Sequence, residues 1–123
     1  MISRYKRHLI KADYVNKEFF KDIAAALGMA PNARLMSDTM LFGQCRFSIG
    51  NKVMRILDNA IIADPVFEFT SMQEPVKKDL GDRYVYSSSY MDADNDNMLV
   101  VTVIENYMLE GPCLVIVTSH RTR

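Results

Sequence analysis

The chain has 123 residues, 49% of them hydrophobic and 24% charged, and its 15 basic and 15 acidic residues cancel to a net charge of zero. This length and composition are typical of one globular domain, which we expect to span residues 1–123, and they exclude a disordered, collagen-like or disulfide-stapled protein. Because no apolar run approaches the ~20 residues of a membrane-spanning helix, we expect no membrane partner.

The charges are unevenly distributed along the chain. Residues 1–57 contain ten basic and four acidic residues, whereas residues 58–110 contain three basic and eleven acidic residues. A protein that presents these blocks as separate surfaces attracts an anionic partner or associates head to tail with another copy. The alternative is that the fold places the basic residues of the first half beside the acidic residues of the second half, so that no strongly charged surface forms.

The two cysteines, Cys45 and Cys113, are too few and too far apart for a disulfide framework, and no C-x-x-C motif occurs. Both stand in apolar stretches, where a free cysteine usually packs as a small hydrophobic residue. Free thiols are typical of a reducing compartment, so we expect a cytoplasmic protein.

The first predicted element is an amphipathic helix over residues 14–27. Its apolar residues recur with a 3.6-residue period, and Gly28 followed by Pro31 predicts its end. The same periodicity continues backwards, so the alternative is one long helix, or two with a break, over residues 3–27. The apolar face of the predicted helix comprises Val15, Phe19, Phe20, Ile23, Ala26 and Leu27.

After residue 39 the apolar residues alternate with a two-residue period. This alternation on both sides of the turn signal Gly50-Asn51 favours a β-hairpin over residues 41–57. The alternative is a helix over residues 51–62, whose apolar residues also fit a 3.6-residue period.

The rest of the chain is predicted to be mainly β. Residues 66–70 predict a short strand, and residues 71–82 predict a charged loop or a short helical turn. The strongest β pattern follows, because residues 83–90, 97–109 and 113–120 predict a three-strand antiparallel meander.

Together these elements predict an α+β fold, in which the N-terminal amphipathic helix packs on a curved antiparallel sheet of five or six strands that ends in a β-meander. The last two strands are apolar on both faces, and such strands need cover on both faces. The helix covers one face, so the other needs a second layer, from the hairpin over residues 41–57 or from another subunit. If the hairpin lies in the same sheet, the second face stays open and is expected to form an interface with a second subunit or another protein. The candidate interface residues are Val101, Val103, Val115 and Val117 on one face, or Val100, Ile104, Leu114 and Ile116 on the opposite face.

No motif for catalysis or cofactor binding is present. The two histidines, His8 and His120, lie at opposite ends of the chain, and no glycine-rich phosphate loop, H-E-x-x-H or G-x-S-x-G motif occurs. Residues 92–97 alternate carboxylates as calcium loops do, but they lack the glycine and the bidentate glutamate of an EF-hand and are typical of a hairpin loop. We therefore expect no catalytic residue, no metal and no cofactor.

The remaining candidate site is a basic face. An anion- or nucleic-acid-binding patch would form if the fold brought the basic residues of the first half together. The isoelectric point of about 6.7 lacks the basic excess that is typical of nucleic-acid-binding domains. The candidate residues are Arg4, Arg7, Lys11, Arg46 and Arg55.

Three functions remain, in this order. The first is a non-enzymatic interaction or assembly module that forms a homo-oligomer or binds a protein partner, a role that would suit a small viral, phage or mobile-element protein. The second is a nucleic-acid-binding regulator that uses the basic N-terminal face. The third is a small ligand-binding domain or enzyme with a cavity between helix and sheet.

Overall fold

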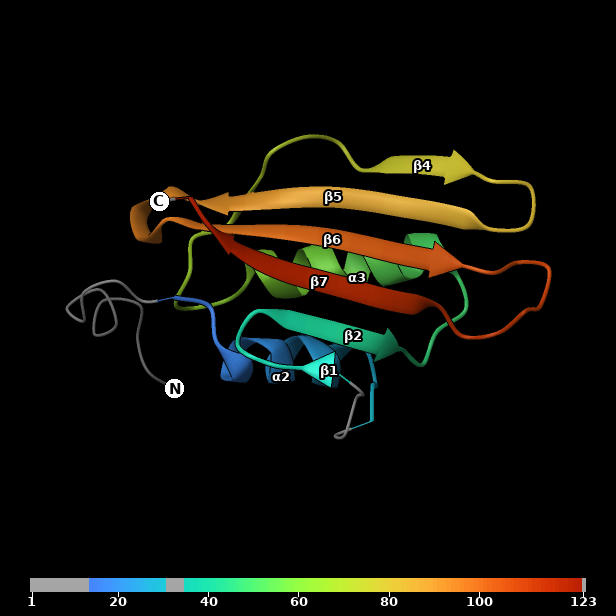
Figure 1. Cartoon of the computed structure of the whole chain (residues 1–123), viewed down its shortest axis with the longest axis horizontal. Helices are drawn as coiled ribbons and strands as arrows, with labels where there is room; N and C mark the ends of the chain where they lie inside the picture. The colour runs from blue at the N-terminus through green and yellow to red at the C-terminus, as the bar shows by residue number, and fades with distance from the viewer. Residues whose placement is uncertain (1–13, 31–34, 123) are drawn as a thin grey trace.

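The structure, a computed structural model, describes residues 14–30 and 35–122. Within these residues two α-helices pack on one antiparallel sheet of seven strands, which confirms the predicted α+β class. The strand order is β1-β2-β7-β6-β5-β3, and β4 also pairs with β5 (Figure 1). The elements are α2 (Lys17–Ala26), β1 (Leu35–Met36), β2 (Met40–Gln44), α3 (Gly50–Ile62), β3 (Thr70–Ser71), β4 (Val76–Asp79), β5 (Tyr84–Asp92), the short 3-10 helix η1 (Ala93–Asn95), β6 (Asn97–Glu105) and β7 (Leu114–Arg121).

Helix α2 lies within the range that the amphipathic pattern predicts. Its N-cap is Asn16, whose side-chain oxygen accepts hydrogen bonds from the backbone N–H groups of Glu18 (3.0 Å) and Phe19 (3.4 Å). The helix ends before Gly28, whose left-handed backbone (φ +63°) is typical of a helix terminus. The alternative of one continuous helix over residues 3–27 is wrong, because residues 14–16 are not helical and the backbone of Asn16 is extended; the part of this range before residue 14 lies outside the described residues. The buried side chains of α2 are Phe19, Phe20, Ile23 and Ala24.

The hairpin predicted over residues 41–57 is wrong, and the alternative helix is correct. Only the first part of this range forms a strand, β2, and Gly50-Asn51 begins helix α3 instead of forming a turn. The helix is favoured because its 3.6-residue period gathers the apolar residues on one side, where they cover strands β5 and β6. Its buried residues are Gly50, Val53, Met54, Leu57 and Ile61.

The strand predicted over residues 66–70 is present only at its last residue, in β3. The Asp64 carboxylate accepts hydrogen bonds from the backbone N–H groups of Val66 (2.8 Å) and Phe67 (3.0 Å), so these groups cannot join a strand ladder. Their side chains pack in the core instead. The charged segment that follows, predicted as a loop or helical turn, contains strand β4, whose four residues are all exposed.

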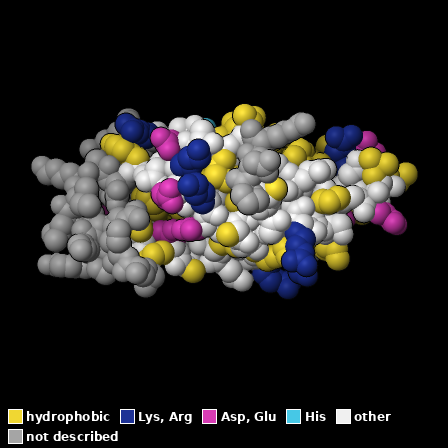
Figure 2. Space-filling model, turned by 90° about the horizontal axis from the view of Figure 1, so that it is seen from below, with side chains coloured by type: hydrophobic (Ala, Val, Ile, Leu, Met, Phe, Trp, Pro, Cys, Tyr) yellow, Lys and Arg dark blue, Asp and Glu magenta, His cyan; other side chains and the backbone are white. Residues whose placement is uncertain are grey.

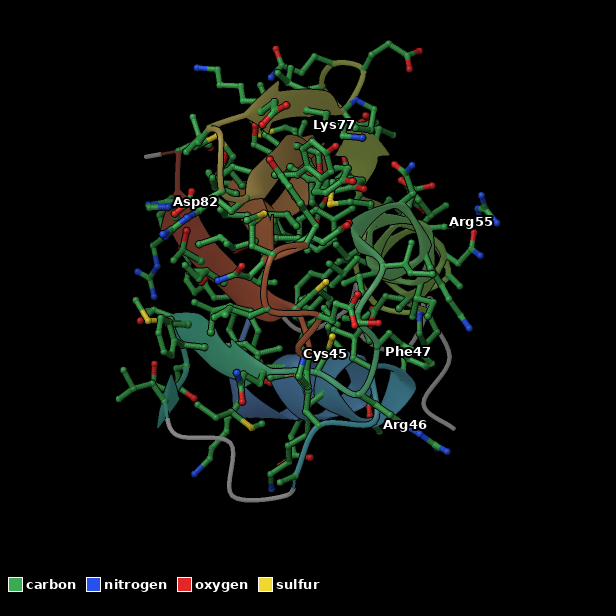
Figure 3. All side chains as sticks on the ribbon, turned by 90° about the vertical axis from the view of Figure 1, so that its right-hand side faces the viewer. Cys45, Arg46, Phe47, Arg55, Lys77 and Asp82 are labelled. Atoms are coloured by element: carbon green, nitrogen blue, oxygen red, sulfur yellow. The ribbon has the colours of Figure 1, made fainter. Side chains whose placement is uncertain are left out.

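The C-terminal meander is confirmed, because β5, β6 and β7 pair as consecutive antiparallel strands. Their register places Tyr86, Val103 and Val115 side by side on one face, and Ile104 beside Leu114 on the other. Both helices lie behind the first of these faces, as Figure 1 and the end view of Figure 3 show. The core therefore lies between the helices and one face of the sheet.

Candidate interface on the open face of the sheet

The four central strands present a second face, which turns away from both helices. No described helix or strand lies over it (Figure 1), and we call it the open face. None of its side chains is charged, and all are half-buried. The open face is defined by its half-buried side chains, which are Met40 and Phe42 of β2, Leu114, Ile116 and Thr118 of β7, Met98, Val100, Thr102 and Ile104 of β6, and Val85, Ser87, Ser89 and Met91 of β5. The same register places exposed polar side chains at its margins, among them Gln44 of β2, His120 of β7 and Lys78 of the edge strand β4.

The register joins these side chains into a continuous apolar band. Ile116 lies opposite Phe42 on one neighbouring strand and opposite Thr102 on the other. In the next row, Ile104 lies opposite Leu114. Opposite residues of antiparallel strands are about 4.5–5.5 Å apart, so their side chains pack against each other across the sheet. The open face is therefore one patch rather than a set of isolated hydrophobic residues.

The four valines predicted first as an interface lie in the core. Val101, Val103, Val115 and Val117 are each 0% exposed, because α2 and α3 lie on their side of the sheet. The prediction assumed that residues 41–57 join the sheet as a hairpin, whereas α3 adds a second helix to the core side. These valines cannot contact another subunit, and the alternative set belongs to the open face.

The predicted basic patch lies only partly within the described residues. Arg4, Arg7 and Lys11 are outside them. The backbone N–H of Arg46 bonds to the carbonyl oxygen at the C-terminal end of α2 (3.0 Å), whereas Arg55 belongs to the exposed side of α3. Figure 3 shows the two arginines at separate places on the molecule. The described part of the fold does not bring Arg46 and Arg55 together.

A groove of about 610 Å³ lies between α3 and strand β4. Its charged lining residues are two basic side chains, Arg55 and Lys77, and two acidic ones, Asp58 and Glu74. The Tyr90 hydroxyl donates a hydrogen bond to Asp58 (2.7 Å). This groove corresponds to the cavity of the third predicted function, but its balanced charges favour no class of ligand.

Glu105, at the end of β6, caps the N-terminus of α3. Ile49 before the helix offers no side-chain cap, and Oε1 of Glu105 accepts hydrogen bonds from the N–H of Gly50 (2.6 Å) and from the Tyr86 hydroxyl (3.2 Å). Burial and the neighbouring Glu105 charge raise the pKa of Tyr86 to about 12. No local sequence pattern indicates this cap, because Gly50 and Glu105 are 55 residues apart.

Raising the pH from 10 towards 12 is expected to destabilise the fold through Tyr86. Unfolded tyrosine loses its proton near pH 10, whereas folded Tyr86 keeps it to about pH 12, so the folded state binds more protons and becomes less stable as the pH rises. The loss is at most about 1.4 kcal/mol per pH unit for one group. In urea unfolding above pH 10, Tyr86→Phe should therefore lose stability less steeply than the wild type. Equal slopes would contradict this role of Tyr86.

Exposed hydrophobic side chains also gather at one end of the molecule, where the β4–β5 and β6–β7 loops lie (Figure 2, right). Leu80, Met108 and Leu109 are 58%, 66% and 76% exposed. The Tyr107 hydroxyl joins the two loops by donating a hydrogen bond to the carbonyl oxygen of Gly81 (2.8 Å). This apolar end is separate from the open face and much smaller.

The other sequence candidates have ordinary local contacts. Residues 92–97 form the connection between β5 and β6, where the Asn95 amide donates to the Asp92 carboxylate (2.8 Å). His120 is exposed near the end of β7, and its ring nitrogen lies 3.0 Å from the Thr118 hydroxyl. In the described part of the chain, no three His, Cys, Asp or Glu side chains are grouped to hold a metal ion. Nor does any helix described there have the length and apolar character to cross a membrane.

Of the surfaces described above, the open face comprises the most side chains that neither pack in the core nor bind another described element. Its function has to be inferred from its own geometry and chemistry. Comparisons with protein-family models, with curated proteins and with solved structures found no match to this chain.

Proposed function

We propose that this protein is a non-enzymatic assembly module and that its open face binds the open face of a second copy. The composition of that face is the observation that supports the proposal most. Its thirteen half-buried side chains are nine hydrophobic residues and four Ser or Thr, and polar side chains on this side of the sheet, such as Gln44, Lys78 and His120, lie at its margins. A contiguous apolar surface of several hundred Å² is at the upper end of what soluble monomers expose, and such patches often mark an interaction site.

The size of the open face fits a stable interface. Four strands spaced about 4.8 Å apart, with about eight residues on average at about 3.3 Å per residue, cover roughly 500 Å² in projection. The relief of the side chains increases the accessible area towards the roughly 800 Å² that each partner buries in an interface of standard size. Two such faces are therefore large enough to hold a dimer together.

The chemistry of the open face favours a second copy over other partners. A two-fold axis places the same uncharged surface on both sides of the contact, and two sheets can then pack about 10 Å apart, as in a β-sandwich. A nucleic acid needs a cluster of cationic side chains, and the described strands carry only one Lys or Arg on this side of the sheet, Lys78 at the edge. A charged protein surface would lose hydration there without gaining an ion pair.

The substitution Ile116→Lys tests the proposal. Ile116 lies in the middle of the open face, so a lysine there would be buried without a partner in a dimer but would reach water in a monomer. In light scattering after gel filtration, the wild type should have twice the 14.1 kDa mass of one chain, and Ile116→Lys the mass of one chain. The matched control is Ile62→Lys, which should stay dimeric because Ile62 is 46% exposed on α3, away from the open face.

High salt separates the two possible causes of association. A dimer formed by the open face should persist, because salt does not weaken apolar contacts, whereas a dimer formed by the basic and acidic halves of the chain should dissociate. Dissociation at high salt, or a wild type that is monomeric at high protein concentration, would overturn the proposal. If the wild type were monomeric and Ile116→Lys strongly reduced its stability, the open face would be covered by other residues of the same chain rather than by a second copy.

A further inference from the structure

Cys45 and Cys113, 68 residues apart in the sequence, are neighbours in the fold. Cys45 directly follows β2 and Cys113 directly precedes β7, so the two extend the register that pairs Gln44 with Leu114. The N–H of Cys45 donates to the carbonyl oxygen of Cys113 (3.0 Å), and the N–H of Cys113 donates to the carbonyl oxygen of Phe47 (2.8 Å). These backbone hydrogen bonds fix the two cysteines against each other.

The positions of the two residues suit a disulfide bond. The N–H of Cys45 bonds directly to the carbonyl oxygen of Cys113, and residues joined in this way across antiparallel strands have Cα atoms about 5.5 Å apart, within the range of about 4.4–6.8 Å that disulfides span. Both side chains are buried in the core, with Cys45 4% and Cys113 0% exposed. The Cys45 thiol donates a hydrogen bond to the carbonyl oxygen of Phe47 (3.3 Å). A bond between the two sulfurs therefore requires little movement of the backbone.

The two thiols differ in reactivity. The hydrogen bond from Cys113 lowers the pKa of Cys45 to about 7 against the opposing effect of burial. The same hydrogen bond, together with burial, raises the pKa of Cys113. At neutral pH, Cys45 is therefore the sulfur that forms a thiolate and attacks an oxidant, and Cys113 is the thiol that lies next to it.

We propose that Cys45 and Cys113 form a two-cysteine oxidation site, which hydrogen peroxide converts to an intramolecular disulfide and a dithiol reductant restores. Cys45 is 4% exposed and Cys113 is 0% exposed, so the oxidant has to be small. A peroxide satisfies this condition, whereas a bulky disulfide such as oxidised glutathione does not. The site lies on the core side of the sheet and is independent of the open face.

The reaction balances in two steps. The Cys45 thiolate attacks one oxygen of hydrogen peroxide, the O–O bond breaks and hydroxide leaves, so Cys45 becomes a sulfenic acid. The sulfur of Cys113 then attacks the sulfur of Cys45, the S–O bond breaks, and the oxygen leaves as water with the Cys113 proton. The two thiols lose two electrons in total, and one peroxide becomes two molecules of water once the hydroxide takes up the proton that Cys45 released.

Treatment of the full chain with hydrogen peroxide at neutral pH tests the proposal. Titration should show the loss of both thiols, and peptide mapping should find Cys45 linked to Cys113 within one chain. The melting temperature should rise by about 10 °C, because the bond closes a long loop of the unfolded chain, and a dithiol should reverse the rise. Oxidation of methionine adds oxygen and removes no thiol, so these measurements distinguish it from the disulfide.

Two variants separate the roles of the cysteines. In Cys113→Ser, peroxide should add oxygen to Cys45, because no neighbouring thiol remains to form the disulfide. In Cys45→Ser, Cys113 should keep its thiol. The wild-type measurements decide the proposal even if a variant does not fold. It is overturned if both thiols survive a peroxide concentration that oxidises free cysteine, if the disulfides join two chains, or if the mapped bond leaves the melting temperature unchanged.

Discussion

Replacement of Gly50 by alanine is expected to lower the free energy of unfolding by about 3 kcal/mol, as overpacking of a buried contact does. A Cβ atom at Gly50 would overlap the ring of Tyr86, with Cδ1 and Cζ of that ring 2.7 Å away and Cε1 closer still. The ring cannot move aside easily, because Tyr86 is 3% exposed and its hydroxyl bonds to Glu105. The helix would have to leave its place against the sheet. Urea unfolding measures the loss.

The sign of this effect is the informative part of the experiment. In a helix without such a contact, alanine is more stable than glycine by roughly 0.5–1 kcal/mol. The matched control is Gly111→Ala, since a Cβ there meets no atom within 4 Å, and its stability should change by less than about 0.5 kcal/mol. If Gly50→Ala were as stable as the wild type, α3 would not lie this close to β5.

Replacement of Phe19 by alanine is expected to destabilise the protein by about 4 kcal/mol, a large part of the total stability of a domain of this size. The Phe19 ring is 4% exposed and lies 5.5 Å from the ring of Phe20 and 5.7 Å from the rings of Phe67 and Phe69. Its removal leaves a cavity at the contact between α2 and the segment after α3, where no other side chain can fill the space without moving. Thermal or urea unfolding gives the difference.

Two further variants show whether the cavity is the cause. Phe19→Leu keeps most of the volume and should lose clearly less stability than Phe19→Ala. Leu109→Ala removes a hydrophobic side chain that is 76% exposed, and its stability should stay within about 0.5 kcal/mol of the wild type. Similar losses for Phe19→Ala and Leu109→Ala would contradict the placement of the aromatic cluster in the core.

The two proposals can fail separately. The open face lies on one side of the sheet, and the Cys45–Cys113 pair lies on the side that the helices cover. Oxidation of the pair should therefore raise the melting temperature without changing the mass in solution. Conversely, Ile116→Lys should change the mass without changing the reaction of the thiols with peroxide.

The amino-acid sequence by itself determined the elements whose signals are local. The predicted first helix rests on its 3.6-residue period and the Gly28 terminus, and α2 lies within the expected range, although it begins after the Asn16 cap rather than at residue 14. The meander needs only three β-rich segments separated by short turns, and β5, β6 and β7 form it. In both cases interactions between residues that are close in the sequence decide whether the segment forms a helix or a strand.

Only the tertiary structure decided which apolar surfaces are covered. Residues 51–62 fit a helix or a hairpin arm almost equally well, and a second helix was favoured because α2 covers only the β1–β2 part of the core face, whereas α3 covers β5 and β6. In a strand that is apolar on both faces, the residues that point to either face are equally hydrophobic. The sequence around Val101 and Ile104 therefore cannot show which of the two faces a helix will cover. That choice buried Val101 and left Ile104 on the open face. The same holds for Cys45 and Cys113, because contacts between distant residues depend on the packing of whole elements rather than on any local pattern.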